Sequence, residues 1–340
     1  MMRISLDNLN KLYQNISSLY PLYLPVKKAG EVNYALYNEN AEVSLETLKT
    51  VKSPKEFFFP QSEDLVKFKI DGNNIEVIDV RKEEPPFIVM GVRACDYKAF
   101  DVLDRVYLQA PKDTFYQNKR NAGIVITNAC FNPEESCFCK VFGIDAVNPL
   151  GDVTTFITDG YLYWRANTPK GEQLTEKIKD LFEDSDDKAV INAQEKAKKI
   201  IDSLPYSNLN LKAFDGEMLD LFNSDKWQDL SEACIGCGTC TFVCPTCQCF
   251  DVKEHIANDG TVSRYRCWDS CMYSDFTKTA GGQPRPTQMQ RYRQRFMHKL
   301  VYYPENNEGI YSCVGCGRCV KSCPRYLNIV KVIKAFSEEN

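Results

Sequence analysis

One cysteine pattern occurs twice in this chain of 340 residues. The pattern is Cys-x2-Cys-x2-Cys-x3-Cys-Pro, and its copies begin at Cys234 and Cys313. Two such runs are the usual ligands of a pair of [4Fe–4S] clusters. Zinc ribbons use two Cys-x2-Cys pairs and have no role for a third regular cysteine followed by Cys-Pro. We therefore interpret the runs as ligands of two iron–sulfur clusters, in preference to zinc ribbons or disulfides.

The spacing within each run predicts which cysteines share a cluster. Three closely spaced thiolates can bind three corners of one cubane, and the chain carries the cysteine before proline to the other cubane. We define the Cys234 set as the first predicted group of ligands and the Cys313 set as the second. The Cys234 set comprises Cys234, Cys237, Cys240 and Cys323, and the Cys313 set comprises Cys313, Cys316, Cys319 and Cys244.

A further group of cysteines, the N-terminal set, lies at predicted strand ends or in the loops that follow them. It comprises Cys95, Cys130, Cys137 and Cys139. Loops that leave neighbouring parallel strands converge at one edge of a sheet, so these thiols could hold a third [4Fe–4S] cluster. The alternative is that they are buried and act as small hydrophobic residues. A Cys-x-Cys pair in a loop is poor core material, and we therefore predict a third cluster.

The last group of cysteines falls between the two runs and comprises Cys247, Cys249, Cys267 and Cys271. The first two directly follow the Cys-Pro turn, and the spacing from Cys267 to Cys271 matches one helical turn. These residues could hold a fourth cluster, or they could line the pocket of the first two clusters. Nothing in their spacing excludes zinc.

The hydrophobic pattern of the first half predicts alternating strands and helices, which defines an α/β (α+β) fold class. Short apolar runs between turn residues are typical of buried strands, and apolar residues with a period of 3.6 are typical of helices. The expected helices span residues 6–18, 98–106 and 168–182, and the expected strands span 23–26, 75–80, 87–92, 123–128, 154–158 and 161–166.

The second half is predicted to form a helix-rich, ferredoxin-like dicluster domain (an α-helical ferredoxin domain). The two cysteine runs lie much farther apart than in a compact bacterial ferredoxin, and each is expected to open or follow a helix. A charged helical connector precedes this domain. The predicted boundaries are 1–182 for the α/β domain, 183–227 for the connector and 228–340 for the dicluster domain.

Composition restricts the compartment and the chemistry. The chain opens without an apolar signal segment and contains no run of about 18 apolar residues, so we expect a cytoplasmic protein without membrane insertion. Its thiols would be reduced there, and exposed clusters would favour an anaerobic cytoplasm. The net charge of −4 gives no global basic field for nucleic acid. With only His255 and His298, histidine-based zinc, haem or non-haem iron sites are disfavoured.

Several common cofactor and catalytic motifs are missing from the sequence. No dinucleotide-binding glycine fingerprint follows a predicted strand, and no phosphate-binding P-loop motif is present. We therefore expect no FAD or NAD site in this chain and place such sites on a partner. No Ser–His or Cys–His constellation is recognisable, so no catalytic residue is assigned.

Residues 261–299 form a basic stretch with eight Lys or Arg residues and two Asp residues. Interleaved aromatic residues would also suit a nucleic-acid surface. A docking face for an acidic partner, or compensation of anionic clusters, is the favoured interpretation. Near the predicted ligands, Lys140, Arg318, Lys321 and Arg325 could also offset cluster charge, or they could be ordinary solvated residues.

Several motifs resemble those of one known group of proteins. In the first half they are Gly91-Val92-Arg93-Ala94-Cys95-Asp96 with Leu103-Asp104, and then Cys130 and Cys137-Phe138-Cys139. In the second half they are Cys244-Pro245-Thr246-Cys247-x-Cys249, Trp268-x-Ser270-Cys271, Ala280-Gly281-Gly282 and Cys313-Val314-Gly315-Cys316-Gly317-Arg318-Cys319. From about residue 85 to 330, the chain resembles the β subunits of sulfhydrogenases and the A component of anaerobic sulfite reductases. Residues 1–80 carry little of this resemblance.

The resemblance implies an iron–sulfur electron-transfer subunit of a cytoplasmic, anaerobic oxidoreductase complex. Its partners would be a flavoprotein that binds NAD(P)H and a catalytic subunit of the NiFe hydrogenase or sulfite reductase type. The Trp268 motif and the Gly91 motif favour the hydrogenase side. Cys267 matches neither family's pattern.

Three other functions remain open from the sequence. The chain could be the A component of a dissimilatory anaerobic sulfite reductase. Its N-terminal cluster could itself reduce a substrate such as a disulfide or sulfite. The third possibility is an interaction module stabilised by zinc.

Overall fold

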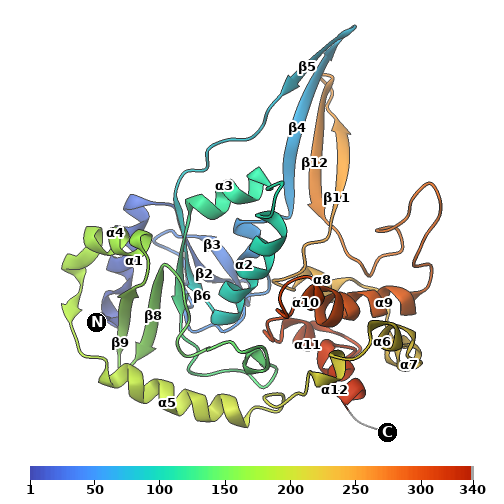
Figure 1. Cartoon of the computed structure of the whole chain (residues 1–340). Helices are drawn as coiled ribbons and strands as arrows, with labels where there is room; N and C mark the ends of the chain where they lie inside the picture. The colour runs from blue at the N-terminus through green and yellow to red at the C-terminus, as the bar shows by residue number, and fades with distance from the viewer. Residues whose placement is uncertain (338–340) are drawn as a thin grey trace.

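The computed structural model describes residues 1–337, and a mixed sheet forms the body of the first half (Figure 1). Its strands are β1 (Met2–Ser5), β2 (Leu22–Lys28), β3 (Glu31–Leu36), β6 (Phe87–Val92), β7 (Gly123–Asn128), β8 (Val153–Thr158), β9 (Tyr161–Ala166) and β10 (Glu183–Asp184). The strand order is β10-β1-β9-β8-β7-β6-β2-β3. Strands β2, β6, β7 and β8 run parallel, and the other pairs are antiparallel. The predicted strands at 87–92 and 123–128 are confirmed.

Helices pack on both faces of this sheet. They are α1 (Leu9–Leu19), α2 (Ala94–Tyr107), α3 (Thr114–Ala122), α4 (Pro169–Ile178) and α5 (Lys188–Ser203). Ile88 and Ile126 share a core with α1 and α4, whereas Val89 and Val125 share a core with α2 and α3. Ile88 and Val89 are consecutive, and successive side chains of a strand point to opposite faces. Burial on both faces explains the nearly continuous apolar sequence of β6 and β7.

A second, antiparallel sheet combines strands from both halves of the chain and extends away from the body (Figure 1). Its strands are β4 (Ser62–Asp71), β5 (Asn74–Ile78), β11 (Phe250–Ile256) and β12 (Thr261–Trp268), in the order β11-β12-β4-β5. Cys267 lies in β12, where it pairs with Asp251 and Ser62. The predicted helical relation between Cys267 and Cys271 is therefore wrong, because the backbone at Cys267 is extended.

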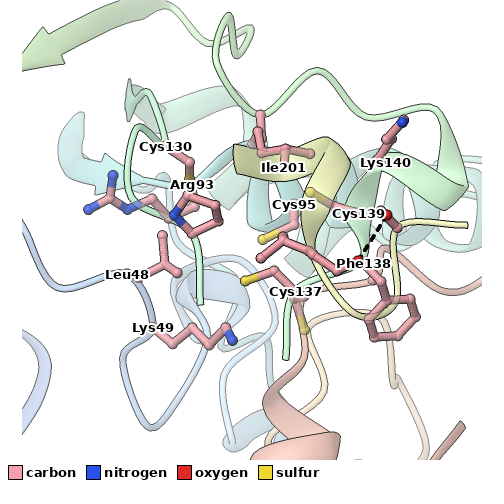
Figure 2. Close-up of a pocket in the computed structure, with 17 residues that line it drawn as sticks. Leu48, Lys49, Arg93, Cys95, Cys130, Cys137, Phe138, Cys139, Lys140 and Ile201 are labelled. Carbon is pink, nitrogen blue, oxygen red and sulfur yellow. Dashed lines mark hydrogen bonds between the residues drawn. The ribbon is translucent and has the colours of Figure 1, made fainter. Parts of the chain in front are cut away.

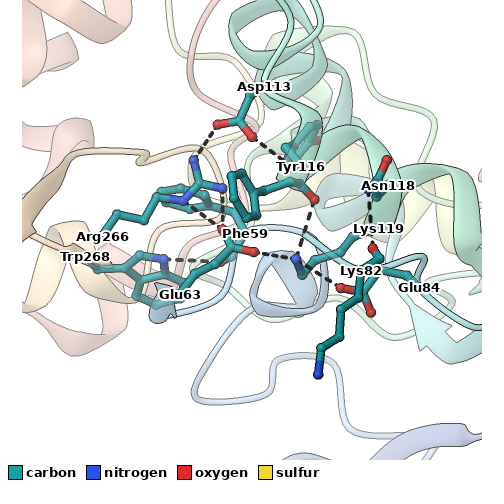
Figure 3. A network of polar contacts seen from close by, with 11 residues as sticks. Phe59, Glu63, Lys82, Glu84, Asp113, Tyr116, Asn118, Lys119, Arg266 and Trp268 are labelled. Atoms are coloured by element: carbon teal, nitrogen blue, oxygen red, sulfur yellow. Dashed lines mark hydrogen bonds and ion pairs between the residues drawn. The ribbon is translucent and has the colours of Figure 1, made fainter. Parts of the chain in front are cut away.

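A buried ionic network fixes the base of this second sheet to the body (Figure 3). The Arg266 guanidinium in β12 donates to Glu63 of β4 and to Asp113, which caps α3. Lys119 of α3 donates to Glu63 as well. The Arg266 side chain is only 3% exposed, so this member of the basic stretch is committed to internal contacts.

We expect Arg266→Met to destabilise the chain by about 2–3 kcal/mol, because it leaves two partly buried carboxylates without their cation. The matched control is Arg264→Met. Arg264 pairs with Glu254 on the exposed part of the same strands, where an ion pair contributes about 1 kcal/mol or less. Thermal denaturation of the anaerobically purified variants measures both effects. Equal shifts in Tm for the two variants would contradict a structural role for the buried network.

Short helices surround the cysteine runs in the second half. They are α6 (Met218–Asn223), α7 (Lys226–Ser231), α8 (Thr239–Phe242), α9 (Gln288–Met297), α10 (Tyr303–Glu305), α11 (Arg318–Ser322) and α12 (Ile329–Ser337). Trp227, Tyr292, Phe296 and Ile333 are buried at their common core. A capping box formed by Thr287 and Gln290 satisfies backbone and side-chain groups where α9 begins. The helices thus form a compact support for the cysteine-bearing loops.

Candidate iron–sulfur sites

The Cys234 set lies around one cavity. Cys234, Cys237, Cys240 and Cys323 all line it, although the last of these belongs to the other cysteine run. Cys240 lies in α8 and Cys323 directly follows α11, and these two helices pack together. The structure therefore brings together the four residues that the crossing pattern predicted.

Orphaned polar atoms test whether this cavity suits a cluster. Tyr292 and Arg295 line the cavity with Cys234 and Cys323 and are at most 2% exposed. The Tyr292 hydroxyl and the Nε and Nη1 of Arg295 have no hydrogen-bond partner in the described part of the chain. Buried polar groups are normally paired. Donors left free beside four cysteines fit a group with anionic sulfur acceptors.

The second cysteine loop and the Cys-Pro turn of the first run come together at Lys299. Its Nζ donates to Thr246 Oγ1 at 2.8 Å and to the Ser312 carbonyl at 2.9 Å. The Thr246 hydroxyl lies 3.2 Å from the Cys244 sulfur, and Ser312 directly precedes Cys313. Lys299 is 3% exposed, so a buried cation joins the two segments that supply the Cys313 set.

The thiols of the Cys313 set lie close enough to affect one another electrostatically. Burial raises the pKa of Cys316 to about 12, and the neighbouring Cys244 and Cys319 act in the same direction. Burial also raises the pKa of Cys313, again with contributions from Cys319 and Cys244. A cluster would remove this cost, because it binds the four sulfurs as thiolates and shares their charge over the metal.

The N-terminal set also lies around one cavity (Figure 2). Cys95 lies in the first turn of α2 after β6, and Cys130 follows β7, the parallel neighbour of β6. Cys137 and Cys139 come from the loop after β7, and all four line the cavity. The convergence of loops at the carboxyl ends of parallel strands, on which the prediction rested, is what positions them.

Two cations line the cavity of the N-terminal set. Arg93 is 5% exposed and donates to the carbonyls of Leu45 and Ala129 at 2.6 and 2.9 Å, while its Nε has no partner in the described residues. Lys49 donates to Ser136 and to Glu134. A buried guanidinium that meets only carbonyls beside four cysteines is chemically suited to an anionic cluster.

The cavity of the N-terminal set and the loop of the Cys313 set are in direct contact. The Phe138 amide donates to the Gly315 carbonyl at 2.9 Å, and Cys316 lines the N-terminal cavity. Gly315 and Gly317 have positive φ, and a Cβ on Gly317 would lie 2.2 Å from the Ser136 carbonyl oxygen. Glycine is required there for both reasons.

The fourth group of cysteines divides. Cys247 and Cys249 follow Cys244 directly, and Cys271 lies beside Cys249. Cys267, by contrast, lies in β12 between Asp251 and Ser62. The structure thus brings three of the four together next to the Cys313 set and separates Cys267 from them.

The basic stretch at 261–299 is mostly internal. Arg266, Arg291, Arg295 and Lys299 are at most 9% exposed, so these four cannot form a docking or nucleic-acid surface. Of the other cations near the predicted ligands, Arg318 is buried against Asp96, whereas Lys140 and Lys321 pair with carboxylates at the surface.

Some residues of these sites carried no signal in the sequence. Lys55 precedes every cysteine and lies far from them in sequence, yet it donates to the carbonyls of Cys244 and Cys247. Tyr292 looked like a core aromatic and is one, but its hydroxyl borders the cavity of the Cys234 set. Only packing between distant segments reveals these roles.

Two kinds of feature are missing from the described residues. No helix within residues 1–337 has the length and apolar character needed to cross a bilayer. Over the same residues, no three His, Cys, Asp or Glu side chains form a group that could hold a single metal ion. The Cys234 set and the N-terminal set are instead arranged around cavities.

Comparison with known proteins agrees with the position of the cysteine runs. Residues 233–327, which contain both runs, match the family model of the 4Fe-4S dicluster domain. The chain is 32% identical over 331 residues to sulfhydrogenase 2 subunit beta of Pyrococcus furiosus, and the alignment covers 96% of each chain. The similarity therefore extends into residues 1–80, where the sequence motifs were weak. No solved structure matches the chain.

Proposed function

The chain belongs to the family of sulfhydrogenase β subunits, and on that premise we propose that it relays electrons between partner subunits of a hydrogenase-like complex. The Cys234 set and the Cys313 set each hold one [4Fe–4S] cluster, and the N-terminal set holds a third. When bound, such clusters accept and donate single electrons. The chain itself positions them and controls their surroundings.

The contact of the three cysteine sets in a row is the observation that carries this proposal. Cys316 of the Cys313 set borders the N-terminal cavity. Cys319 of the same set lies near Cys240 of the Cys234 set, since it adds to the effect of burial that raises the pKa of Cys240 to about 11. The order is therefore N-terminal set, Cys313 set, Cys234 set. A row of adjacent sites suits a relay.

The two ends of the row differ in exposure. Cys237 is exposed and its neighbour Ile235 is 66% exposed, so the Cys234 end is accessible to a partner protein. Cys130, Cys137 and Cys139 are each at most 9% exposed. A buried N-terminal set favours electron relay over direct reduction of a substrate there.

Residues of the chain tune the sites through charge and solvent exclusion. Arg93, Arg295 and Lys299 place buried positive charge beside the three sets, which favours the reduced, more negative state of a cluster. Phe296 and Met272 line the cavity of the Cys234 set and exclude water from it. These are positioning and electrostatic roles, and no catalytic residue is assigned.

The proposed partners are a flavoprotein that binds NAD(P)H and a catalytic subunit of the NiFe hydrogenase type. The relative's name, sulfhydrogenase 2 subunit beta, supports a multisubunit assembly of this kind. The A component of an anaerobic sulfite reductase is the second candidate, because the same cysteine sets would serve it equally. Copurification from the native host under anaerobic conditions distinguishes the two by the catalytic subunit recovered.

The proposal is tested by metal analysis of the anaerobically purified chain and its Cys139→Ala variant. We expect iron and acid-labile sulfide in the wild type, with a paramagnetic signal after reduction. Cys139→Ala should lower the iron content by about four atoms per chain, the content of one cubane. A colourless wild-type protein that contains zinc would refute the electron-transfer function. Unchanged iron in Cys139→Ala would refute the N-terminal cluster alone.

A further inference from the structure

Three cysteines outside the proposed ligand sets lie together next to Cys244. The Cys271 thiol donates to Cys249 and lowers the pKa of Cys249 to about 7. The Cys247 thiol donates to Cys244, and Cys271 is also near Cys247. Cys271 belongs to the segment after β12, whereas Cys247 and Cys249 precede β11. The second sheet therefore returns the chain to the point from which it left.

Buried cations surround this group of cysteines. Lys55, Arg295 and Lys299 are 2%, 2% and 3% exposed. Lys55 Nζ donates to the carbonyl oxygens of Cys244 at 2.9 Å and Cys247 at 2.7 Å, and lies 4.0 Å from the centre of the Trp268 ring.

None of these three cations pairs with a carboxylate in the described part of the chain. The other deeply buried cations of the second half behave differently, since Arg318 pairs with Asp96 and Arg266 with Glu63. An uncompensated buried charge costs several kcal/mol. The compensating negative charge around Lys55 must therefore come from sulfur.

The Cys313 set alone does not supply that charge for all three cations. Lys299 lies between Cys244 and Cys313 and thus faces that set. Lys55 lies on the other side, where Cys247 and Cys249 are among its nearest ionisable neighbours. If these thiols were neutral, Lys55 would be a buried cation with only carbonyls and an aromatic ring around it. Metal-bound thiolates resolve this imbalance.

We propose that Cys247, Cys249 and Cys271 bind a further iron–sulfur cluster beside the Cys313 set, with Lys55 as its buried counter-charge and without participation of Cys267. This inference rests on the proposed iron–sulfur function and extends it by one site. The position next to Cys244 makes it a branch from the middle of the row of clusters, and the three thiolates distinguish it from the four-cysteine sets.

The test compares Cys271→Ser with Cys267→Ser, a matched control for the loss of a cysteine four residues away. After anaerobic purification, Cys271→Ser should contain roughly three to four fewer iron atoms per chain than the wild type, with acid-labile sulfide lowered in parallel. Cys267→Ser should match the wild type. Unchanged iron in Cys271→Ser, or an equal loss in Cys267→Ser, would overturn the proposal, as would zinc bound in place of iron.

Native mass spectrometry of the wild type provides a second measurement that does not depend on the folding of a variant. The intact chain should carry one cluster beyond those of the Cys234, Cys313 and N-terminal sets. A mass that accounts for those sets alone would overturn this inference and leave the proposed function intact. A wild-type mass without any cluster would instead refute the proposed function.

Discussion

Replacing Cys323 by alanine is expected to remove the cluster of the opposite cysteine run. Cys323 lies in the second run by sequence, but it lines the cavity of Cys234, Cys237 and Cys240. Losing one of four thiolates exposes a corner of the cubane, so the variant should lose about four iron atoms per chain. The loss should also destabilise the helices around the cavity, because the free donors of Tyr292 and Arg295 then remain buried without acceptors.

The identity of the lost cluster is the sharp part of this prediction. Cys323→Ala should leave the same reduced-state paramagnetic spectrum and the same midpoint potentials as Cys237→Ala. Cys319→Ala, which lies four residues from Cys323 in the same run, should leave a different residual spectrum. Redox titration followed by electron paramagnetic resonance compares the three variants. If Cys323→Ala matched Cys319→Ala instead, the crossed arrangement would be wrong.

Arg318→Met should give the largest loss of stability among the ion-pair variants. The Arg318 and Asp96 side chains are 4% and 2% exposed, and the guanidinium donates to both carboxylate oxygens at 2.5 and 2.8 Å. Burial lowers the pKa of Arg318, but Asp96 outweighs it and holds that pKa above its usual range. Removal of the cation strands a buried carboxylate, which costs about 3–5 kcal/mol.

The controls for this prediction use the same helix and the same pair. Lys321→Met removes a cation that is 66% exposed and pairs with Glu134 at 3.5 Å, so its effect should be below about 1 kcal/mol. The double variant Arg318→Met/Asp96→Leu should recover much of the stability, because neither charge remains. Thermal denaturation under anaerobic conditions gives the Tm of each variant. A double variant as unstable as Arg318→Met would show that the pair is not the cause.

The consequence of breaking this pair reaches beyond stability. Asp96 follows Cys95 of the N-terminal set, and Arg318 lies between Cys316 and Cys319 of the Cys313 set. The ion pair therefore fixes the two cysteine sets against each other. The resemblance to known families already singled out both residues within their motifs, but only the structure identifies them as partners.

Much of the candidate site was predictable from local sequence. The strands at β6 and β7 have apolar runs that follow from burial on both faces, and their loops lead to the N-terminal set. The composition of the Cys234 set followed from the position of Cys323 before proline. These predictions depend on spacing over a few residues and on a rule about parallel strands, both of which local sequence carries.

Other features were missed because they depend on pairing between distant segments. β11 and β12 join β4 across almost two hundred residues, and the sequence between the cysteine runs was not recognised as strands. The spacing of Cys267 and Cys271 resembled a helical turn, but sheet pairing with Ser62 and Asp251 holds Cys267 in an extended backbone. The basic stretch was assigned to the surface or to cluster charge, and burial selects the second for Arg295 and Lys299.

The sequence by itself determined the chemistry of this protein, because ligand type and spacing within each run are covalent properties that place three thiolates around one cluster in any fold. The tertiary structure alone decided how the sites are connected. It brought Cys316 to the N-terminal cavity, separated Cys267 from Cys271 and buried Lys55 beside Cys247. Such contacts join segments far apart in the chain, and their geometry is set by the packing of whole sheets and helices rather than by any local pattern.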